Sequence, residues 1–439
     1  MILVSIVKGL VEKVPKPIAK FLSKVPFRFR LGKQYSYYFR ACEDKSYFEI
    51  DNQYLKRLQY IVDYAKKNSR FYSSLYHDRF ENFVVNSIED FKQLPIVTKA
   101  DLQAQALETR VAEADKAFRV NTGGTSGSPL GFLLDKNAFS REWAHMHYIW
   151  MKHGYRCDDI KLTLRGKHFK SERVIKYNAV HNEYVVNASA SMKSVVDVLL
   201  RHIEKESISW IHGYPSLVAE FACELATRTS QDRELVKRKL KGVLLGSEFP
   251  SSVYRRQIAA NLSQNVVSWY GHSEMGVLAE EISEGVYRSL PSYGYAEAVQ
   301  SEDGSGYRLV CTSYHNTAHP FIRYDTGDLV EPIRTEGSSL VFKIKEGRVG
   351  DFIIDKFGKK HSLTAVIFGR HHKAFDFVQH VQVEQKDENH IKLLVTLRDD
   401  ISPSKILSLF DLSGLPFEFD VVRLSDPIRT KNGKIKLKI

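Results

Sequence analysis

The stretch ISWIHGYPSLVAEFACELATR, residues 208–228, and the nearby LKGVLLGSE, residues 240–248, decide the fold. ISWIHGY and LKGVLLGSE are short apolar runs typical of buried strands. PSLVAEFACELATR, between them, is predicted to be a helix. A succession of strand, helix and apolar strand indicates a parallel sheet that is covered by helices.

The same alternation continues on both sides of this stretch. DIKLTLRG (159–166) and NVVSWYGHSE (265–274) are predicted strands, and residues 192–206 and 250–263 are predicted helices. Further upstream, apolar residues at helical spacing predict helices within 51–77 and 136–155. Thr98 is the expected N-cap of another helix, with Asp101 at its third position.

The pattern changes in the last third of the chain. From about residue 285 to 345, short alternating strands such as GYRLVCTSY (306–314) and SLVFKIKE (339–346) predict an antiparallel subdomain. The last ninety or so residues mix strands and helices, HIKLLVTL (390–397) among them, and suit a small separate domain. We therefore expect an α/β protein with a large N-terminal domain, residues 1–347, and a small mobile α+β domain, residues 348–439.

The composition indicates a globular protein but does not identify its ligand. The chain has 439 residues, 43% of them hydrophobic, and a formal net charge of +12. The positive charge favours anionic partners. No nucleic-acid-binding module is recognisable in the sequence. The dependence of binding on salt would distinguish a nucleic-acid-binding protein from one with a nucleotide site. The four cysteines are far apart and lack metal-ligand spacing, which fits a reducing, cytoplasmic setting.

The N-terminal segment, residues 1–33, combines short apolar runs with recurring lysines. It has neither the layout of a signal peptide nor the length of a membrane-spanning helix. Two interpretations remain open. The segment could lie on a membrane surface as a basic amphipathic element, or it could pack on the main domain with its lysines solvated.

A loop rich in glycine and hydroxyl residues precedes the alternating region. It reads VNTGGTSGSPLGFLLD, residues 120–135. It lacks the Gly-Lys-Ser/Thr of a Walker loop and the G-x-G-x-x-G of a dinucleotide-binding turn. Glycines that allow close approach, together with backbone N–H groups and hydroxyls, could nevertheless hold phosphates.

Unusual residues follow two of the predicted strands, at the edge where parallel sheets gather ligands. LLGSEFP (244–250) and SWYGHSEMG (268–276) are the two strand ends, and IRYDTGDLV, EGRVGDFI and a closing IRTKNGKIKLKI follow later. In this order, the motifs resemble those of the adenylate-forming superfamily of acyl-CoA synthetases, adenylation domains and luciferases. Leu130 in place of the usual lysine, together with LPIVTKADL and IRYDTGD, resembles the phenylacetate-CoA ligase branch, and WIHGYPS and WYGHSE look closest to its CapK-like group.

The resemblance covers the chain from about residue 50 to its end and implies a site for ATP. Matched to the family's phosphate loop are Thr122, Gly124, Thr125, Ser126 and Gly127. Matched to the adenine-binding segments are Gly246, Ser247, Glu248, Tyr270 and Gly271. Asp328 matches the aspartate that binds the ribose hydroxyls, and Arg348 the arginine near the ribose and the α-phosphate. Arg323 and Thr326 are secondary candidates that could be structural.

The resemblance also implies the residues of the chemical step. Glu274 matches the family's magnesium-associated glutamate, and Lys434 matches the catalytic lysine of the C-terminal domain. Gly350 stands at the hinge position, which usually holds an acidic residue or lysine, so the use of a second, rotated state is in doubt. His212, Tyr214 and His272 are expected to face the pocket for the acid. Several other histidines, at positions 145, 147, 153, 371 and 372, are expected to be packed or solvated.

The implied activity is an ATP- and Mg²⁺-dependent ligase that forms an acyl-adenylate, releases pyrophosphate and passes the acyl group to CoA. A sugar amine or a carrier protein is an alternative acceptor, because the CapK-like group is associated with capsule and O-antigen biosynthesis. A non-catalytic binding homologue is the rival class, against which the presence of Glu274, Asp328, Arg348 and Lys434 argues. The sequence does not identify the acid.

Overall fold

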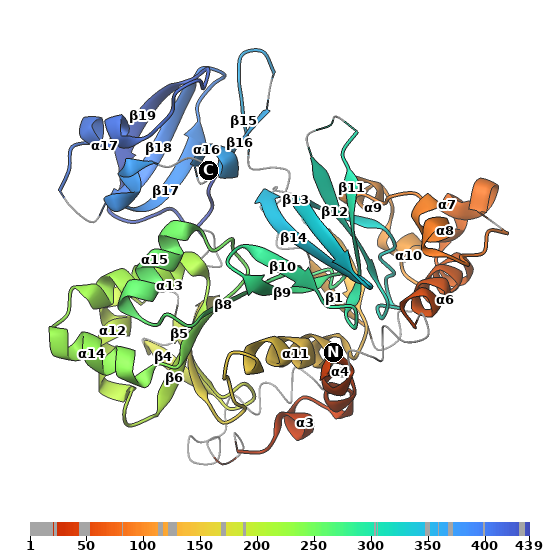
Figure 1. The fold of residues 1–439 in the computed structure, drawn as a ribbon, viewed down its shortest axis with the longest axis horizontal. Coiled ribbons are helices and arrows are strands. Elements are labelled where there is room, and N and C mark those ends of the chain that lie inside the picture. Colours follow the sequence, from red (N-terminus) through yellow and green to blue (C-terminus); the bar gives the residue numbers. More distant parts are fainter. Residues whose placement is uncertain are drawn as a thin grey trace. The chain divides into compact units, whose positions relative to one another are not determined.

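The structure is a computed structural model. It describes residues 21, 24–43, 53–80, 82–112, 117–121, 130–167, 173–187, 190–302, 304, 306–346, 352–358, 360–367, 372–397, 400–429 and 435–439. The chain folds into two compact units (Figure 1). The first unit contains residues 1–157 and 269–348, and the second contains residues 158–268 and 349–439.

The helices of the first unit come from the N-terminal part of the chain. They are α3 (Phe27–Arg30), α4 (Lys33–Glu43), α6 (Gln53–Asn68), α7 (Arg70–Phe80), α8 (Ile88–Gln93), α9 (Lys99–Gln103), α10 (Leu107–Arg110) and α11 (Ala138–Met151). Thr98 caps α9 in a capping box with Asp101, as the sequence predicts. The helical pattern of residues 51–77 corresponds to α6 and α7, which are separated at Ser69.

The strands of the first unit form an antiparallel sheet in the order β11-β12-β13-β14-β10-β9. Their bounds are β9 (Leu278–Ser283), β10 (Val286–Ser289), β11 (Gly294–Gln300), β12 (Tyr307–Ser313), β13 (Tyr324–Glu336) and β14 (Ser339–Glu346). A separate hairpin joins β1 (Phe118–Asn121) to β2 (Gly131–Leu134). The expectation of an antiparallel subdomain over 285–345 is therefore confirmed.

The second unit contains the parallel sheet that the stretch 208–248 predicts. Its strands are β3 (Ile160–Lys167), β4 (Ile175–Asn178), β5 (Glu183–Asn187), β6 (Ile208–Gly213), β7 (Gly242–Leu245) and the first half of β8 (Val266–Gly271). Neighbours pair in the order β8-β7-β6-β3-β5-β4, and all pairs except β4–β5 are parallel. The last three residues of β8 pair instead with β9, antiparallel.

Four helices cover this parallel sheet: α12 (Met192–His202), α13 (Pro215–Ala226), α14 (Ser230–Lys239) and α15 (Ser252–Asn261). Helix α13 is central, because Val218, Phe221 and Leu225 are fully buried in its core cluster. Full burial of each such side chain stabilises the fold by about 1.5–3 kcal/mol. Gly213 ends β6, where an added Cβ would lie 2.5 Å from the Leu164 carbonyl oxygen, so the close packing of β6 on β3 requires glycine.

The C-terminal residues of the second unit form their own small layer. A three-stranded sheet in the order β17-β18-β19 is built from β17 (Val378–Gln385), β18 (His390–Leu397) and β19 (Glu418–Arg423). Around it lie β15 (Phe352–Ile354), β16 (Lys360–Ser362), α16 (Leu363–Ile367), the 3₁₀ helix η2 (Lys373–Asp376) and α17 (Pro403–Leu409). The predicted strand HIKLLVTL coincides with β18. The α/β fold class is confirmed, and the domain boundary at 347/348 stays a prediction.

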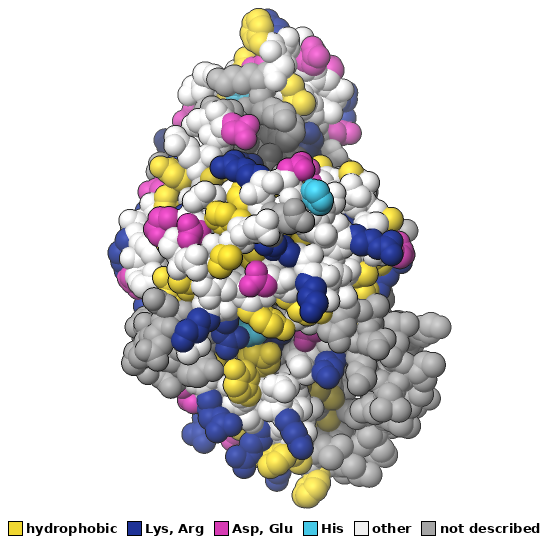
Figure 2. All heavy atoms as spheres, turned by 90° about the vertical axis from the view of Figure 1, so that its right-hand side faces the viewer, with side chains coloured by type: hydrophobic (Ala, Val, Ile, Leu, Met, Phe, Trp, Pro, Cys, Tyr) yellow, Lys and Arg dark blue, Asp and Glu magenta, His cyan; other side chains and the backbone are white. Residues whose placement is uncertain are grey.

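Exposed aromatic and basic side chains occur together near the start of the described chain. Phe21 and Phe29 are 72% and 67% exposed, and Arg28 and Arg30 flank Phe29. The face drawn in Figure 2 carries Lys and Arg side chains with hydrophobic ones among them in its lower part. Among the described residues, no helix is long and apolar enough to cross a membrane.

Candidate active site

Tyr270 and Asp328 meet in the first unit, although 58 residues separate them in the chain. Tyr270 lies near the end of β8, and Asp328 lies on β13. The buried Tyr270 hydroxyl donates a hydrogen bond to the Asp328 carboxylate, whose residue is 6% exposed. Burial, followed by the Asp328 charge, raises the pKa of Tyr270 well above its ordinary value. Tyr270 is therefore a neutral donor that orients a buried carboxylate.

His272 and Glu274 form a second buried pair just beyond the end of β8. The Glu274 carboxylate lies 3.0 Å from His272 Nδ1 and accepts a hydrogen bond of 3.1 Å from the Tyr324 hydroxyl. On its other side, His272 Nε2 lies 3.6 Å from Cys311 Sγ. Burial favours the neutral ring, but the neighbouring Cys311 and Glu274 outweigh it and raise the pKa of His272 to about 10. The shift favours the charged ring, which is held against Glu274.

Gly276 explains how the SWYGHSEMG loop comes so near to β12. A Cβ at Gly276 would lie 2.4 Å from Cys311 Sγ, so a larger residue would push the loop away from the strand. The glycine thereby allows the His272 ring to reach Cys311.

The IRYDTGD segment combines structural residues with the candidate ligand Asp328. Arg323 donates to both oxygens of Glu297, at 2.8 and 3.1 Å, and its remaining terminal nitrogen contacts the Lys92 and Leu94 carbonyls. The Arg323 guanidinium therefore stabilises the fold. The Thr326 hydroxyl donates to the Leu309 carbonyl at 2.8 Å and accepts from the Asp328 amide at 3.2 Å. Thr326 positions Asp328.

In the second unit, the candidates at the ends of β6 and β7 lie together. The Gly246 amide donates to the Gly213 carbonyl at 3.2 Å, and the Glu248 carboxylate accepts from the Ser216 amide at 3.2 Å. Ser247 has φ of 71°, a left-handed conformation that turns the chain sharply after β7. Tyr214 follows Gly213 directly and stands at the N-cap of α13.

His212 is buried beside Arg165, at 1% exposure. Arg165 NH2 donates to His212 Nε2 at 3.1 Å, so this ring nitrogen is an acceptor and the ring is neutral. Burial, Arg165 and two further basic groups, Lys161 and His181, lower the pKa of His212 well below its ordinary value. Its role is therefore to hold Arg165 at the carboxyl end of β3.

Sequence reasoning did not single out Arg165, Tyr324 or Cys311. Arg165 lies near the end of the predicted strand DIKLTLRG. A charged residue at the end of an apolar strand could have indicated a candidate site residue. Tyr324 lies within the IRYDTGD motif, one residue after Arg323. Cys311 gives no such signal, because 39 residues separate it from His272 in the chain.

Several candidate residues lie outside the part of the chain that the structure describes. They are Thr122, Gly124, Thr125, Ser126, Gly127, Arg348, Gly350 and Lys434. Gly271 is described and is the last residue of β8. Of the histidines that were expected to be packed or solvated, His145 and His147 are fully buried on α11, His372 is buried, His153 is exposed, and His371 lies outside the described residues.

Comparison with known proteins adds to this geometry. No family model matches the sequence. Protein CapK of Staphylococcus aureus is 23% identical to this chain over 382 residues, which are 84% of this chain and 82% of CapK. A 2-hydroxyisobutyryl-CoA ligase in the postadenylation state, in complex with R3-HIB-AMP, superimposes with a TM-score of 0.64 over 89% of both chains, at 17% identity. The chain is thus similar in sequence to CapK over most of its length and shares the fold of this CoA ligase.

A second solved structure supports the same fold. The GH3.15 acyl acid amido synthetase matches 85% of this chain and 86% of its own chain, with a TM-score of 0.55 and 13% identity. The two solved structures are thus named for different acyl acceptors. At these sequence identities the two structures establish a shared fold, and they do not identify the acyl acceptor of the present chain.

Proposed function

We propose that this protein activates a carboxylic acid with ATP, forms an acyl-adenylate and releases pyrophosphate. The acyl group then passes to CoA, as in the phenylacetate-CoA ligase type, and the reaction serves surface polysaccharide biosynthesis in the cytoplasm. The observation that carries the proposal is the pair of buried carboxylates in the first unit, Asp328 and Glu274. Each coincides with a family-matched position, and each is held by a neighbouring side chain.

Asp328 suits the ribose hydroxyls of ATP. A carboxylate has about four lone-pair sites, and the Tyr270 hydroxyl donates to one of its oxygens. An ionised carboxylate accepts hydroxyl protons, and Tyr270 and Thr326 keep that of Asp328 oriented. Such preorganisation lowers the entropy cost of binding.

Glu274 fits Mg²⁺ as one carboxylate ligand. Mg²⁺ is usually held by one or two carboxylates together with phosphate oxygens and water. The described residues contain no group of three or more His, Cys, Asp or Glu side chains that could hold a metal ion. Phosphate oxygens would therefore supply the other ligands, and the bound ion would neutralise phosphate charge. His272 and Tyr324 fix the carboxylate that would hold it.

The proposed first step is attack of the substrate carboxylate on the α-phosphorus, which breaks the bond to pyrophosphate. Thr122, Gly124, Thr125, Ser126 and Gly127 would bind the phosphates through backbone N–H groups and hydroxyls. Arg348 and Lys434 would stabilise the negative charge that develops on the phosphate oxygens and on the departing pyrophosphate.

We assign the binding of the acid substrate and of the acyl acceptor to the second unit. His212 and Tyr214 stand at the carboxyl end of β6, which is where ligands gather in parallel sheets. Arg165, held by His212, adds a positive charge that would attract a carboxylate. A sugar amine or a carrier-protein thiol is the alternative acceptor to CoA, and both would attack the same acyl carbon.

A pyrophosphate-release screen over carboxylic acids tests the proposal. The reaction contains ATP, Mg²⁺ and one acid at a time, with and without CoA. We expect at least one acid to cause release above the acid-free rate, and AMP to appear once an acceptor takes the acyl group from the adenylate. Conversion of the adenylate by CoA or by an amino sugar assigns the acceptor. ATP binding without acid-dependent pyrophosphate release across a broad screen would favour a non-catalytic binding protein.

A further inference from the structure

Helix α4, near the start of the described chain, packs on α3 and on α11. The inner side of α3 and α4 is anchored on α11. The Phe27 ring stacks on the His147 ring with 4.0 Å between their centres, and the Tyr35 hydroxyl lies 2.9 Å from His147 Nδ1. The Ser140 hydroxyl donates to the Leu31 carbonyl, between the two helices, at 2.5 Å. These contacts leave the other side chains of α3 and α4 facing solvent.

The solvent-facing side carries basic and aromatic side chains. Phe21 and Phe29 are 72% and 67% exposed, and the Arg28 guanidinium lies 4.8 Å from the centre of the Phe29 ring. On α4, Lys33 and Arg40 are exposed at positions i and i+7, which share one face of a helix. The residues of this N-terminal surface are Phe21, Lys24, Arg28, Phe29, Lys33 and Arg40.

The positive charge of the N-terminal surface is not balanced by acidic residues nearby in the sequence. Residues 13–42 contain eight lysines and arginines and no aspartate or glutamate. Among the described residues, no carboxylate forms an ion pair with a cation of the N-terminal surface. A local excess of positive charge attracts anionic partners.

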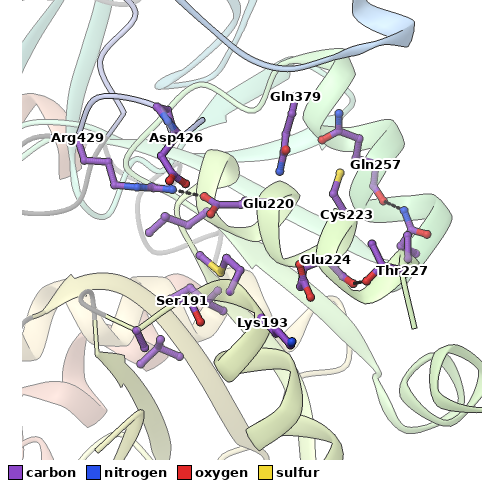
Figure 3. Close-up of a pocket in the computed structure, with 18 of the residues that line it drawn as sticks. Ser191, Lys193, Glu220, Cys223, Glu224, Thr227, Gln257, Gln379, Asp426 and Arg429 are labelled. Atoms are coloured by element: carbon purple, nitrogen blue, oxygen red, sulfur yellow. Dashed lines mark hydrogen bonds and ion pairs between the residues drawn. The ribbon is translucent and has the colours of Figure 1, made fainter. Parts of the chain in front are cut away.

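The large cavity of the second unit shows the contrast in charge. It has a volume of about 930 Å³, and its wall includes the carboxylates of Glu220, Glu224 and Asp426 beside its cations. The Glu220 carboxylate contacts Arg429, as Figure 3 shows. Pairing of this kind neutralises charge within the protein, whereas the N-terminal surface presents its charge to solvent.

The phenylalanines of the N-terminal surface narrow the class of anionic partner. Their rings carry no polar atom, so transfer of Phe21 and Phe29 from water into an apolar environment is favourable. Basic residues together with exposed phenylalanine are typical of elements that lie in the interface of a bilayer, with apolar groups at the acyl boundary. Clusters of about four to eight Lys or Arg on such elements are typical of binding to anionic lipids.

Single-stranded nucleic acid is the other polyanion that basic and aromatic side chains bind, because bases stack on aromatic rings. The sequence before the N-terminal surface favours lipid. Residues 1–20 contain nine isoleucine, leucine or valine residues. Aliphatic side chains offer no ring on which a base can stack, but their burial among acyl chains is favourable.

We propose that the N-terminal surface docks the protein on an anionic lipid bilayer, with Phe21 and Phe29 in the interface and the cations on the lipid headgroups. The inner side of α3 and α4 stays packed on α11, so docking requires no rearrangement of these helices. The proposal concerns where the protein is held and not which reaction it catalyses, and it does not depend on the proposed adenylation.

Vesicle flotation with the full-length chain tests the proposal. We expect binding to phosphatidylcholine vesicles that contain phosphatidylglycerol, and much weaker binding to vesicles of phosphatidylcholine alone. Raising the ionic strength from about 0.01 M to about 1 M shortens the Debye length from about 30 Å to about 3 Å, so binding should fall steeply. A single-stranded oligonucleotide is the second probe, and its binding is measured by fluorescence anisotropy.

Variants locate the binding. Arg28→Ala and Lys33→Ala should each weaken binding to the anionic vesicles by about fivefold, and Phe29→Ala by about tenfold. Lys356→Ala and Phe357→Ala are the matched controls and should leave binding unchanged. Phe357 is 79% exposed and Lys356 Nζ lies 5.3 Å from its ring centre, so this pair has the same chemistry outside the N-terminal surface. All five residues are exposed, and thermal unfolding checks that each variant folds.

Each outcome bears on the proposal. Salt-sensitive binding to anionic vesicles that the N-terminal variants weaken and the controls do not supports it. Absence of vesicle binding at low salt overturns it, as does binding that variants and controls weaken equally. Equal binding to neutral and anionic vesicles overturns the role of the cations. Oligonucleotide binding that the same variants weaken, without vesicle binding, would identify nucleic acid as the partner instead. Acid-dependent pyrophosphate release is measured separately, so a failure here leaves the proposed function standing.

Discussion

His212 and His272 each stand at the end of a buried strand, yet their neighbours shift their pKa values in opposite directions. His272, in the first unit, contacts Glu274 and has its pKa raised to about 10. His212, in the second unit, accepts from Arg165 and has its pKa lowered well below the ordinary value. Both rings are buried, so burial alone does not separate them.

The difference teaches that a strand-end motif fixes a position but not a charge. In the first unit, hydroxyls and a histidine ring hold two buried carboxylates, whose oxygens can accept protons. In the second unit, a neutral ring holds a cationic guanidinium, which favours an anion.

The largest expected effect is that of a substitution of Lys434, which would act in the proposed adenylation reaction. Lys434→Ala should slow acid-dependent pyrophosphate release by about 10²–10³, the usual cost of one preorganised charge contact in a transition state. ATP affinity, measured by calorimetry, should change little, because we assign nucleotide binding to Asp328 and the phosphate loop.

Two further measurements make the Lys434 test specific. Lys436→Ala removes a neighbouring charge of the same basic tail and should leave the rate within about twofold, since surface substitutions have small effects. A synthetic acyl-adenylate should still be turned over by Lys434→Ala. Equal loss of both half-reactions would contradict a role confined to adenylation.

A smaller effect is expected for the ribose contact in the first unit. Asp328→Asn should weaken ATP binding by about 1.5–3 kcal/mol, the contribution of hydrogen bonds to a charged group. Asp420→Asn, at an exposed position on β19, is the matched control. Titration of ATP into both variants measures the difference. An unchanged affinity in Asp328→Asn would remove the ribose assignment and leave Asp328 as a structural partner of Tyr270.

The sequence predicts the parallel sheet well because α13 and the strands around it obey simple periodicities that tertiary packing reinforces. It also predicts Asp328 and Glu274 through the motifs in which they occur. It could not predict the protonation of His212 and His272, since the deciding neighbours, Arg165 and Cys311, lie 47 and 39 residues away in the chain.

The pH dependence of stability distinguishes the two histidines. A raised pKa in the folded state means that folding binds a proton, so the contribution of His272 is fully present below about pH 6.5 and is lost as the pH rises through about 10. His272→Asn keeps a donor toward Glu274 but exchanges a charge-assisted hydrogen bond for a neutral one, at a cost of about 1 kcal/mol near pH 6.5. Urea unfolding of wild type and variant should show this gap closing toward pH 10. A gap that does not change with pH would show that His272 is not charged.

The smallest effect at neutral pH is expected for a substitution of His212. On acidification, its effect on stability should have the opposite sign to that of His272→Asn. His212→Gln retains an acceptor for Arg165 and should change stability at pH 7 by no more than about 0.5 kcal/mol. Because the pKa of His212 is lowered in the folded state, the unfolded chain binds more protons below about pH 6.5, and wild type is destabilised there. The variant lacks this penalty, so it should gain up to about 1.4 kcal/mol relative to wild type for each pH unit below 6.5. Urea unfolding between pH 7 and 5 measures this gain, and His77→Gln, at an exposed histidine, is the control. A His212→Gln variant that loses stability relative to wild type on acidification would mean that His212 is charged like His272, and the contrast between the two regions would fail.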